Sequence, residues 1–567
     1  MKKLPKGISN YEELVTEDYY YVDKTSFIEK LENLEDKRIM FLRPRKFGKT
    51  LFTSTLENYY DILKTDKFDK LFGDTYIGEH PTPNKNRYYI LKFNFSGIPT
   101  GTEEETIEGF KVKVIAPIKE FIQKYKMDFY VNENETAEGI LYNLIKAFGI
   151  QKSGEKIYVI IDEYDHFANE LLGFETEKFK NLVSKNGKVR KWYEILKEGT
   201  ESVVDRIFIT GVAPITLDST TSGFNIATDI TKDLNFNDML GFCEKDVISL
   251  MDAVEIPKDK QAELLPVIKQ NYDGYIFSTK IKEDFEKYRI YNSNMTLYFL
   301  SKYKEYNEIP EELVDTNIIS DYGKIESFMD LCNDMGKIEL LQKIVAGEYV
   351  ESEITEKFNA GIAFGEKELI SLLFYLGYLT IVDKGYSKYK FKVPNDIIRK
   401  IYSEYFLAYI SKKAEINADR IDTENINRQI LEIGDISGII EVLETYLSNL
   451  SNRDYKNFDE KYVKVIFYSL AKMLGTMLVK SELEVGTKYS DILMIPREKL
   501  TERYGILIEF KYIKKEDYTE EALKQKQNEA KKQLQKYLIT EEIKMIPKLR
   551  TYNVVAVKDE IYVEEIK

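Results

Sequence analysis

The sequence predicts an α/β protein whose first part is built around a parallel sheet. Three short apolar runs support this fold class, at residues 39–42, 157–161 and 207–209. A continuous apolar run of this length is typical of a strand buried on both faces of a parallel sheet. Polar residues follow each run, at the sheet edge where open α/β folds bind their ligands. We therefore expect a ligand site at the carboxyl ends of these strands.

The first run leads into the stretch FLRPRKFGKTLF, residues 41–52, which predicts a phosphate-binding loop. The usual pattern is G-x-x-x-x-G-K-[ST], and Gly48, Lys49 and Thr50 match its end. Arg43 stands where the first glycine is expected. Apolar residues then recur at helical spacing, so the loop lies between a strand and a helix. Backbone N–H groups at the helix start would bind phosphates, with Lys49 on the β- and γ-phosphates and the Thr50 hydroxyl on Mg²⁺.

The other two runs end in residues that would complete a nucleoside triphosphate site. Asp162 would hold Mg²⁺, directly or through water, and Glu163 would orient the attacking water. Thr210 ends the third run, where its hydroxyl would sense the γ-phosphate. The alternative for the acidic pair is an exposed strand end without a chemical role. The residues predicted to contact the nucleotide are Arg45, Phe47, Gly48, Lys49, Thr50, Leu51, Asp162 and Thr210.

Composition limits the kinds of metal site that the chain can build. The sequence of 567 residues is long enough for two to four domains, yet it has only two histidines and two cysteines. A zinc site made of cysteine and histidine is therefore excluded. Any metal is expected to be Mg²⁺ or Mn²⁺ held by carboxylates.

Charge and hydropathy limit the partners. The net charge of −14 argues against a protein coated for nonspecific nucleic-acid binding. The longest apolar run, residues 370–382, has 13 residues, whereas a membrane span needs about 20. That run predicts a buried helix or a helix followed by a strand. We expect a soluble, cytoplasmic protein with no membrane partner.

A second acidic constellation lies near the end of the sequence. Asp491 is predicted to open a short strand, and Glu509 and Lys511 lie on the next one. Because side chains alternate along a strand, Glu509 and Lys511 share one face. If the two strands pair as a hairpin, Asp491 and Glu509 converge on one metal and Lys511 positions or activates water beside it. This spacing is the D…E-x-K arrangement of PD-(D/E)XK nucleases.

Residues 241–405 show no catalytic constellation. They alternate helix-like stretches with aromatic clusters, and a short hairpin is expected near residues 378–393. The hairpin suits the wing of a winged-helix-like module. Such a wing can contact DNA, or it can pack beside a nucleotide-dependent switch. The sequence favours packing.

Five blocks of the sequence resemble, in order, the AAA-ATPase-like family of bacterial and mobile-element proteins. They are YYYVDKTSFIEKL, FLRPRKFGKTLF, VIIDEYD, FITGVAPI with SGFNIATDIT, and YDGYIF with RIYNSNM. The family commonly has R-P-R-[RK]-F-G-K-[ST] as its phosphate loop, so Arg43 resembles a family variant, with Pro44 fixing one φ angle. The resemblance also implies that Asp23 and Lys24 lie near the nucleotide. An N-terminal edge element is the alternative for that pair.

The C-terminal region resembles the nuclease-like domain usually attached to that family. That domain typically reads E-S-G-x-G-R-x-D, then I-E-F-K, then A-x-x-Q-[IL]. The resemblance implies Glu484 as the first acid, Asp491 and Glu509 as metal ligands, Lys511 as the catalytic lysine and Gln533 as a supporting residue. Lys488 and Tyr489 stand where the family usually has Gly-Arg. That departure removes an arginine contact to the substrate phosphate unless Lys488 replaces it.

The blocks together predict an ATP-binding, ATP-hydrolysing protein with a Mg²⁺-dependent nuclease centre. The expected domains are a P-loop NTPase domain at 1–240, a helical and winged-helix-like connector at 241–405, and a restriction-endonuclease-like α/β domain at 406–567. The expected substrate is nucleic acid, DNA rather than RNA, in defence or on mobile DNA, and oligomerisation is left open.

Two other functions are compatible with the same blocks. The main alternative is a STAND-like signalling switch whose inactive nuclease fold serves only for binding. A ring ATPase is a weaker alternative because Arg206 is a poor arginine finger.

Overall fold

A computed structural model divides the chain into two compact units, Met1–Cys332 with Glu351–Ile397, and Asn333–Val350 with Ile398–Lys567. It describes residues 2–166, 187–215, 226–315, 325–329, 334–358, 364–450, 459–485, 488–496, 503–546 and 548–566. Within these ranges, the side chains at 327–328, 334–335, 481–490 and 541–542 are not described. The predicted domain boundaries near residues 240 and 405 stay predictions.

A five-stranded parallel sheet forms the centre of the first unit, with the strand order β2-β3-β4-β1-β5. Its strands are β1 Arg38–Leu42, β2 Tyr89–Asn94, β3 Ile157–Asp162, β4 Val204–Gly211 and β5 Thr228–Asp229. The predicted parallel sheet and its three predicted strands are confirmed. The sequence analysis missed β2 and β5.

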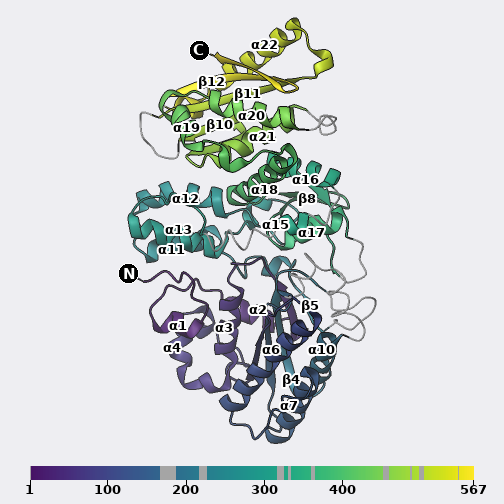
Figure 1. Ribbon diagram of the computed structural model, residues 1–567. Helices are drawn as coiled ribbons and strands as arrows, with labels where there is room; N and C mark the ends of the chain where they lie inside the picture. The colour runs from purple at the N-terminus through teal and green to yellow at the C-terminus, as the bar shows by residue number, and fades with distance from the viewer. Residues whose placement is uncertain are drawn as a thin grey trace. The chain divides into compact units, whose positions relative to one another are not determined.

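Helices cover both faces of this sheet (Figure 1). They are α3 Lys49–Tyr60 on one face and α6 Glu103–Lys124, α7 Ala137–Gln151 and α10 Lys188–Gly199 on the other. On the α3 face, the ring of Phe52 lies 5.9 Å from that of Phe208. On the opposite face, the ring of Trp192 lies 5.0 Å from that of Phe93. Strand residues are buried on both sides, which explains the unbroken apolar runs.

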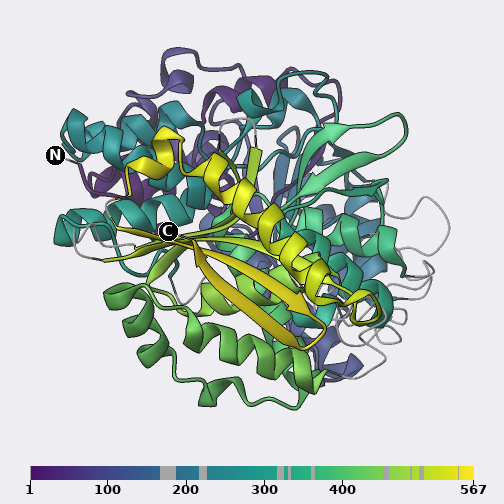
Figure 2. The ribbon, with the colours of Figure 1, turned by 90° about the horizontal axis from the view of Figure 1, so that it is seen from above.

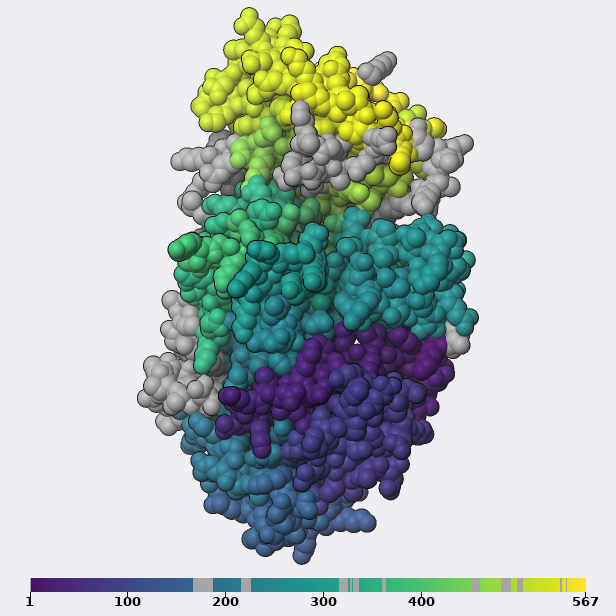
Figure 3. Space-filling view, turned by 180° about the vertical axis from the view of Figure 1, so that it is seen from behind, coloured from purple at the N-terminus to yellow at the C-terminus, as the bar shows by residue number. Residues whose placement is uncertain are grey.

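Further helices complete the first unit. Those before the sheet and around it are α1 Tyr11–Thr16, α2 Ser26–Glu32, α4 Phe68–Phe72 and α5 Tyr76–Glu79. Those after it are α11 Glu244–Ala253, α12 Lys258–Tyr272, α13 Ser293–Tyr306, α15 Ile325–Met329 and α17 Glu366–Tyr375. Figure 3 shows the purple N-terminal segment lying against the teal α11–α13 region, where Lys24 pairs with Asp246 at 2.7 Å.

The expected hairpin is present as β7 Thr380–Lys384 and β8 Tyr389–Lys392, which pair in antiparallel fashion. With β6 Val350–Ser352 these strands form a small sheet of order β6-β8-β7. The apolar run at 370–382 is a helix followed by a strand, α17 and β7, as expected. Among the described residues, no helix is both long enough and apolar enough to cross a membrane.

The second unit contains a mixed five-stranded sheet of order β13-β12-β11-β10-β9. Its strands are β9 Met477–Val485, β10 Lys488–Pro496, β11 Gly505–Ile513, β12 Leu549–Val557 and β13 Glu560–Ile566. The β11–β12 pair is parallel, and the other pairs are antiparallel. The predicted pairing of the strands that carry Asp491 and Glu509 is confirmed, because they are β10 and β11.

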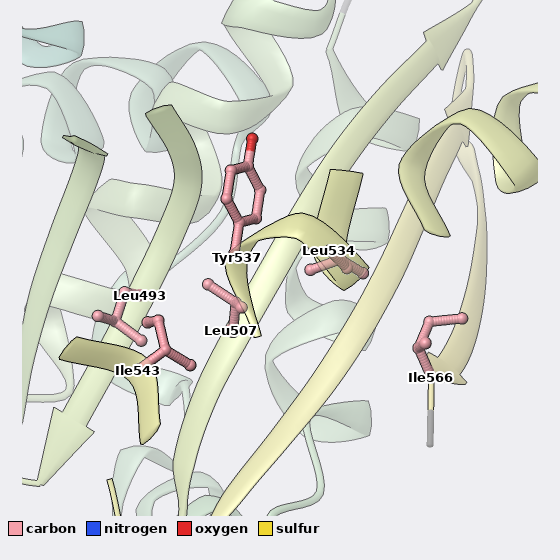
Figure 4. Close-up of a cluster of buried hydrophobic side chains, with 6 residues drawn as sticks. All are labelled: Leu493, Leu507, Leu534, Tyr537, Ile543 and Ile566. Carbon is pink, nitrogen blue, oxygen red and sulfur yellow. The ribbon is translucent and has the colours of Figure 1, made fainter. Parts of the chain in front are cut away.

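Helix α22 Glu520–Tyr537 connects β11 to β12 and lies across the sheet (Figure 2). Its apolar face packs on the strands in a buried cluster shown in Figure 4, made of Leu493, Leu507, Leu534, Tyr537, Ile543 and Ile566. The other helices of this unit are α16 Asp334–Ala346, α18 Asp396–Ala414, α19 Thr423–Arg428, α20 Ser437–Asn449, α21 Glu460–Met473 and α23 Glu541–Lys544.

Candidate functional site

The loop between β1 and α3 turns through two residues with positive φ. Lys46 has φ +69° and Gly48, the residue that caps α3, has φ +93°. Glycine reaches this region without steric cost, which explains Gly48. The Gly48 turn exposes the first backbone N–H groups of α3, as a phosphate-binding loop requires.

Arg43 takes a structural role at the position of the missing glycine. Its guanidinium carbon lies 4.1 Å from the ring centroid of Phe41 and 4.4 Å from that of Phe277. Its two Nη atoms donate hydrogen bonds of 2.9–3.0 Å to the carbonyl oxygens of Leu42, Thr231, Phe236 and Asn237. Burial lowers the pKa of Arg43 to about 9, so the side chain stays charged at neutral pH. Arg43 thus anchors the loop instead of contacting phosphate.

Lys49 points back into its own loop. Its Nζ donates to the carbonyl oxygens of Arg43 at 3.0 Å and Pro44 at 3.1 Å. The same atom lies 3.7 Å from Oε1 of Glu163, and the residue is only 5% exposed. The loop lysine and the predicted water-orienting acid therefore meet, as the sequence predicts for one site.

Asp162 and Thr210 lie next to each other behind this pair. Strand β4 runs between β1 and β3, with Thr210 opposite Phe41 and Ile209 opposite Ile161. The Thr210 hydroxyl and Oδ2 of Asp162 are buried without a hydrogen-bond partner among the described residues. Oδ1 of Asp162 accepts the N–H of Glu163 at 3.0 Å.

The environment of Asp162 suits a bound cation. Burial, and then the charge of Glu163, raise the pKa of Asp162, while Lys49 and the Thr50 side chain oppose the rise. A buried carboxylate with an unpaired oxygen is costly unless a cation compensates it. Asp162 and Thr50 are therefore chemically suited to Mg²⁺, which prefers oxygen ligands.

A cavity of about 480 Å³ lies over the loop. This volume falls in the usual range for a nucleotide-sized ligand, about 300–1,000 Å³. Its polar lining includes Arg45, Lys46, Lys49, Thr50, Asn94, Ser96, Glu163 and His166. Its apolar lining includes Ile8, Leu14, Tyr20, Tyr21, Leu240, Phe242 and Leu297. The lining thus combines polar groups that suit phosphates with apolar and aromatic side chains.

Asn94 and Ser96 are lining residues that sequence reasoning missed. Asn94 ends β2, opposite Asp162 in the strand register, and Ser96 follows the strand. The signal in the sequence was YYILKFN, a short, mainly apolar run that ends in a polar residue.

The YVDKT block contributes only one of its two predicted residues to the cavity. Lys24 lines the cavity and pairs with Asp246 at 2.7 Å. The carboxylate of Asp23 instead accepts the backbone N–H groups of Thr25 at 2.8 Å and Tyr76 at 2.7 Å. Asp23 therefore stabilises the local turn and the start of α5.

Residues far away in the sequence also pack against the phosphate loop. The ring of Phe47 lies 4.9 Å from that of Tyr275 and 5.6 Å from that of Phe277, edge-on in both cases. Gly377, just before β7, has φ +82°, and a Cβ added there would lie 2.8 Å from Cγ of Pro44. Gly377, which precedes the hairpin, thus packs directly against the loop. The packing role of the wing itself stays a prediction.

Arg206 lies at the amino-terminal part of β4, away from Thr210. It is 6% exposed; burial lowers the pKa of its guanidinium, but the neighbouring Tyr60 and Tyr158 outweigh burial, and the pKa is raised. This buried position among tyrosines is consistent with the expectation that Arg206 is a poor arginine finger.

The second candidate site brings together Asp491, Glu509 and Lys511. Oδ2 of Asp491 accepts the N–H of Phe510 at 2.7 Å. Nζ of Lys511 donates to Oε1 of Glu509 at 3.0 Å and to the carbonyl oxygen of Phe510 at 2.8 Å. The expectation that Asp491 opens a short strand is wrong, because β10 begins at Lys488, where it pairs with β9 as well.

Burial raises the pKa values of both acids of this site, Asp491 and Glu509. Glu509 is 2% exposed, and burial, followed by the charge of Asp491, raises the pKa of Glu509 to about 7. Burial also raises the pKa of Asp491, opposed mainly by Lys464. Oε2 of Glu509 is buried with no hydrogen-bond partner among the described residues. The pair is therefore suited to share a divalent cation.

Two charged residues near Asp491, Lys464 and Glu460, were not predicted from the sequence. Nζ of Lys464, on α21, lies 2.6 Å from Oδ1 of Asp491 and 2.9 Å from Oε1 of Glu460. All three line a cavity of about 260 Å³. In the sequence, Glu460 and Lys464 form an i,i+4 pair that is indistinguishable from an ordinary surface ion pair of a helix.

The remaining predicted nuclease residues are less informative. Glu484 lies on β9 opposite Tyr489 on β10, but the side chains of Glu484, Lys488 and Tyr489 lie outside the described part. Gln533 lies on α22, half-buried, and its Oε1 is buried without a hydrogen-bond partner among the described residues.

Among the described residues, the side chains of neither site form a complete set of metal ligands. In the parts of the chain that the structure describes, no group of three or more histidine, cysteine or acidic side chains is positioned to hold an ion. Mg²⁺ commonly binds through one or two carboxylates and completes its shell with water and substrate phosphates. The two acids of the second site, and Asp162 with Thr50 in the first, suit that mode.

Two family models match parts of the chain, one in each of the regions that carry a candidate site. Residues 5–221 match the family model described as predicted AAA-ATPase, and residues 458–565 match that of the PD-(D/E)XK nuclease superfamily. The chain is also 25% identical over 486 residues to a protein of Azotobacter chroococcum mcd 1 described as the uncharacterized protein in vnfD 5'region. That similarity covers 84% of this chain and 83% of the relative. Residues 5–221 are thus an AAA-ATPase-like domain, and residues 458–565 are a domain of the PD-(D/E)XK nuclease superfamily.

Proposed function

We propose that this protein binds and hydrolyses ATP and cleaves nucleic acid, DNA in preference to RNA, at a Mg²⁺-dependent centre. The observation that carries the nuclease assignment is the convergence of Asp491, Glu509 and Lys511 on two paired strands, with Lys511 3.0 Å from Glu509. A role in defence or on mobile DNA follows from the family resemblance.

The cavity over the phosphate loop supports ATP binding. The backbone N–H groups at the start of α3 would bind the phosphates, and Lys49 would leave the carbonyl oxygens of its own loop for the β- and γ-phosphates. Thr50 and Asp162 would hold Mg²⁺, which neutralises phosphate charge when bound. Glu163 would orient the attacking water, and the Thr210 hydroxyl would contact the γ-phosphate.

The second site supports phosphodiester hydrolysis. Asp491 and Glu509 would hold Mg²⁺, which stabilises charge on the scissile phosphate when bound. Lys511, kept in place by Glu509 and the Phe510 carbonyl oxygen, would position the attacking water and stabilise charge that develops on the phosphate. Burial of Glu509 and partial burial of Asp491 would strengthen these electrostatic interactions.

A cleavage assay with matched variants tests the nuclease assignment. Supercoiled plasmid, single-stranded DNA and single-stranded RNA are incubated in Mg²⁺ or Mn²⁺, with and without ATP. The variant Asp491→Asn/Glu509→Gln, which preserves side-chain shape, is expected to lose at least about a hundredfold in rate because two metal ligands lose their charge. Glu516→Gln, an exposed acid in the turn after β11, is the control that keeps wild-type cleavage.

A fluorescent ATP analogue tests the nucleotide assignment. Lys49→Ala is expected to weaken binding at least about tenfold, because a charge-assisted contact to phosphate is lost. Lys37→Ala, an exposed lysine before β1 paired with Asp205, should bind as wild type does. Nucleotide binding without cleavage under any condition would instead favour the signalling switch with a nuclease fold that only binds.

A further inference from the structure

Lys464 holds one of the two predicted metal ligands of the nuclease centre. Its Nζ lies 2.6 Å from Oδ1 of Asp491, and the side chain of Asp491 is 12% exposed. The other oxygen, Oδ2, accepts the backbone N–H of Phe510 at 2.7 Å. Each oxygen of Asp491 therefore accepts a hydrogen bond, and a divalent cation on Oδ1 would compete with the positive charge of Lys464.

The two metal ligands differ in this respect. Oε1 of Glu509 accepts from Lys511, but its Oε2 is buried with no hydrogen-bond partner among the described residues. Within the described part of the chain, Glu509 thus has an oxygen without a competing partner, whereas a cation at Oδ1 of Asp491 meets the ammonium group of Lys464. Asp491 is therefore the ligand at which a protein cation opposes metal binding.

Of the two partners of Asp491, only Lys464 can leave easily. The N–H of Phe510 belongs to the backbone of β11, which pairs with strands on both sides. Lys464 carries its charge at the end of a flexible four-carbon stem. Its Nζ also lies 2.9 Å from Oε1 of Glu460, and it borders the cavity of about 260 Å³. The ammonium group can move away from Asp491 and keep Glu460 as its partner.

We propose that Lys464 is a positioning residue that occupies the cation position on Asp491 and must release it before a divalent metal binds. This inference rests on the proposed nuclease centre. Removal of the ammonium group is expected to strengthen metal binding, since it removes both a competing partner and a repulsive charge. In this way Lys464 sets the metal concentration at which the centre becomes competent.

The test measures Mn²⁺ binding directly by electron paramagnetic resonance of free Mn²⁺, without nucleic acid or nucleotide. Wild type and full-length variants are compared, and Asp491→Asn identifies the binding that belongs to this centre. Lys464→Met is expected to bind Mn²⁺ at that site about tenfold more tightly, the size of one charge-assisted hydrogen bond. Lys464→Arg, which keeps a cation at this position, is expected to restore affinity to near that of wild type.

Lys461→Met is the matched control. Lys461 borders the same cavity and lies on the same helix, but it pairs with Glu348 at 2.5 Å instead of Asp491. Its substitution removes the same charge and should leave the Mn²⁺ affinity unchanged within about twofold, since the pair is partly exposed. Tighter binding in both variants would overturn the proposal in favour of a general charge effect.

Other outcomes separate this inference from the proposed function. If Asp491-dependent Mn²⁺ binding exists and Lys464→Met leaves it equal or weaker, with an unchanged circular dichroism spectrum, the Lys464 proposal is wrong and the nuclease centre stands. If neither wild type nor Lys464→Met shows any Asp491-dependent binding, the metal centre itself is wrong, and the proposal with it.

Discussion

Arg43 shows how a single residue can replace a glycine in a phosphate loop. A glycine is usual at that position because the loop turns sharply there. Here the left-handed backbone lies further along, at Lys46 and Gly48. The side chain of Arg43 holds the start of the loop through four carbonyl oxygens and two aromatic rings. The variant is therefore an anchored loop and not a damaged one.

Restoring the consensus by Arg43→Gly is expected to destabilise the protein. Four buried carbonyl oxygens lose their donor and a cavity opens between Phe41 and Phe277, which together cost at least about 3 kcal/mol. Urea unfolding measures the change. Arg38→Ala, at the start of the strand that leads to Arg43 but 39% exposed and paired with Asp36, is the control and should cost no more than about 1 kcal/mol. Equal effects of the two substitutions would contradict the anchoring role.

Asp273 predicts a pH dependence of stability. It is 4% exposed, and burial raises its pKa from 3.8 to about 6, opposed first by the N–H of Gly274. Between about pH 4 and 6, the carboxyl group of Asp273 is therefore protonated in the folded state and ionised in the unfolded chain. Stability falls as the pH rises through this window, and above it the loss amounts to about 3 kcal/mol.

Asp273→Asn should remove this dependence. The variant is expected to be more stable than wild type by about 2–3 kcal/mol at pH 7.5, and the difference should shrink as the pH falls toward 4. The free energy of unfolding, measured in urea at several pH values, gives the comparison. A difference that is constant over this range would show that Asp273 does not titrate as the structure indicates.

The contact between the phosphate loop and the hairpin region joins two elements that are far apart in the sequence. Gly377 lies against Pro44, and the ring of Phe47 packs against the rings of Tyr275 and Phe277. The shape of the loop thus depends on packing from residues more than 200 positions downstream. The packing role of the wing, β7 and β8, stays a prediction.

Gly377→Ala is expected to disturb the loop through that contact. Its Cβ would lie 2.8 Å from Cγ of Pro44, so either the loop or the hairpin must move, and ATP binding should weaken several-fold. Gly97→Ala is the matched control, because Gly97 also has positive φ, +68°, but a Cβ there meets nothing within 4 Å. Both substitutions introduce a backbone strain of about 1 kcal/mol at a positive φ angle. A difference in ATP affinity between the two variants therefore reports on the Pro44 contact. Equal ATP affinities would argue against it.

The whole molecule carries a candidate nucleotide site and a candidate nuclease centre on one chain. We expect ATP to change the rate of nucleic-acid cleavage in wild type by about 5–150-fold, the usual range of coupling between two sites. Lys49→Ala should abolish that response, whereas Lys37→Ala should keep it. Cleavage assays with and without ATP measure the effect. Cleavage by Lys49→Ala that responds to ATP as wild type does would show that this loop does not control the centre.

The sequence determined the parallel sheet, the phosphate loop and the paired strands of the nuclease centre. Each depends on local pattern: apolar runs of strand length, glycine where φ is positive, and alternation that places Glu509 and Lys511 together. Their roles in chemistry are still predictions. Strand β2 is harder to predict because Lys92 interrupts its apolar run, so it matches neither a continuous apolar run nor a strict alternation.

Only the tertiary structure decided the environment of those residues. The anchoring of Arg43, the contact of Gly377 with Pro44 and the ion pair of Lys464 with Asp491 all join segments that no local pattern relates. An arginine in a loop and an i,i+4 ion pair on a helix look the same in sequence whether they are exposed or buried. Their burial and partners depend on how distant elements pack, and that packing decides whether a charged residue anchors a loop, binds a ligand or is only solvated.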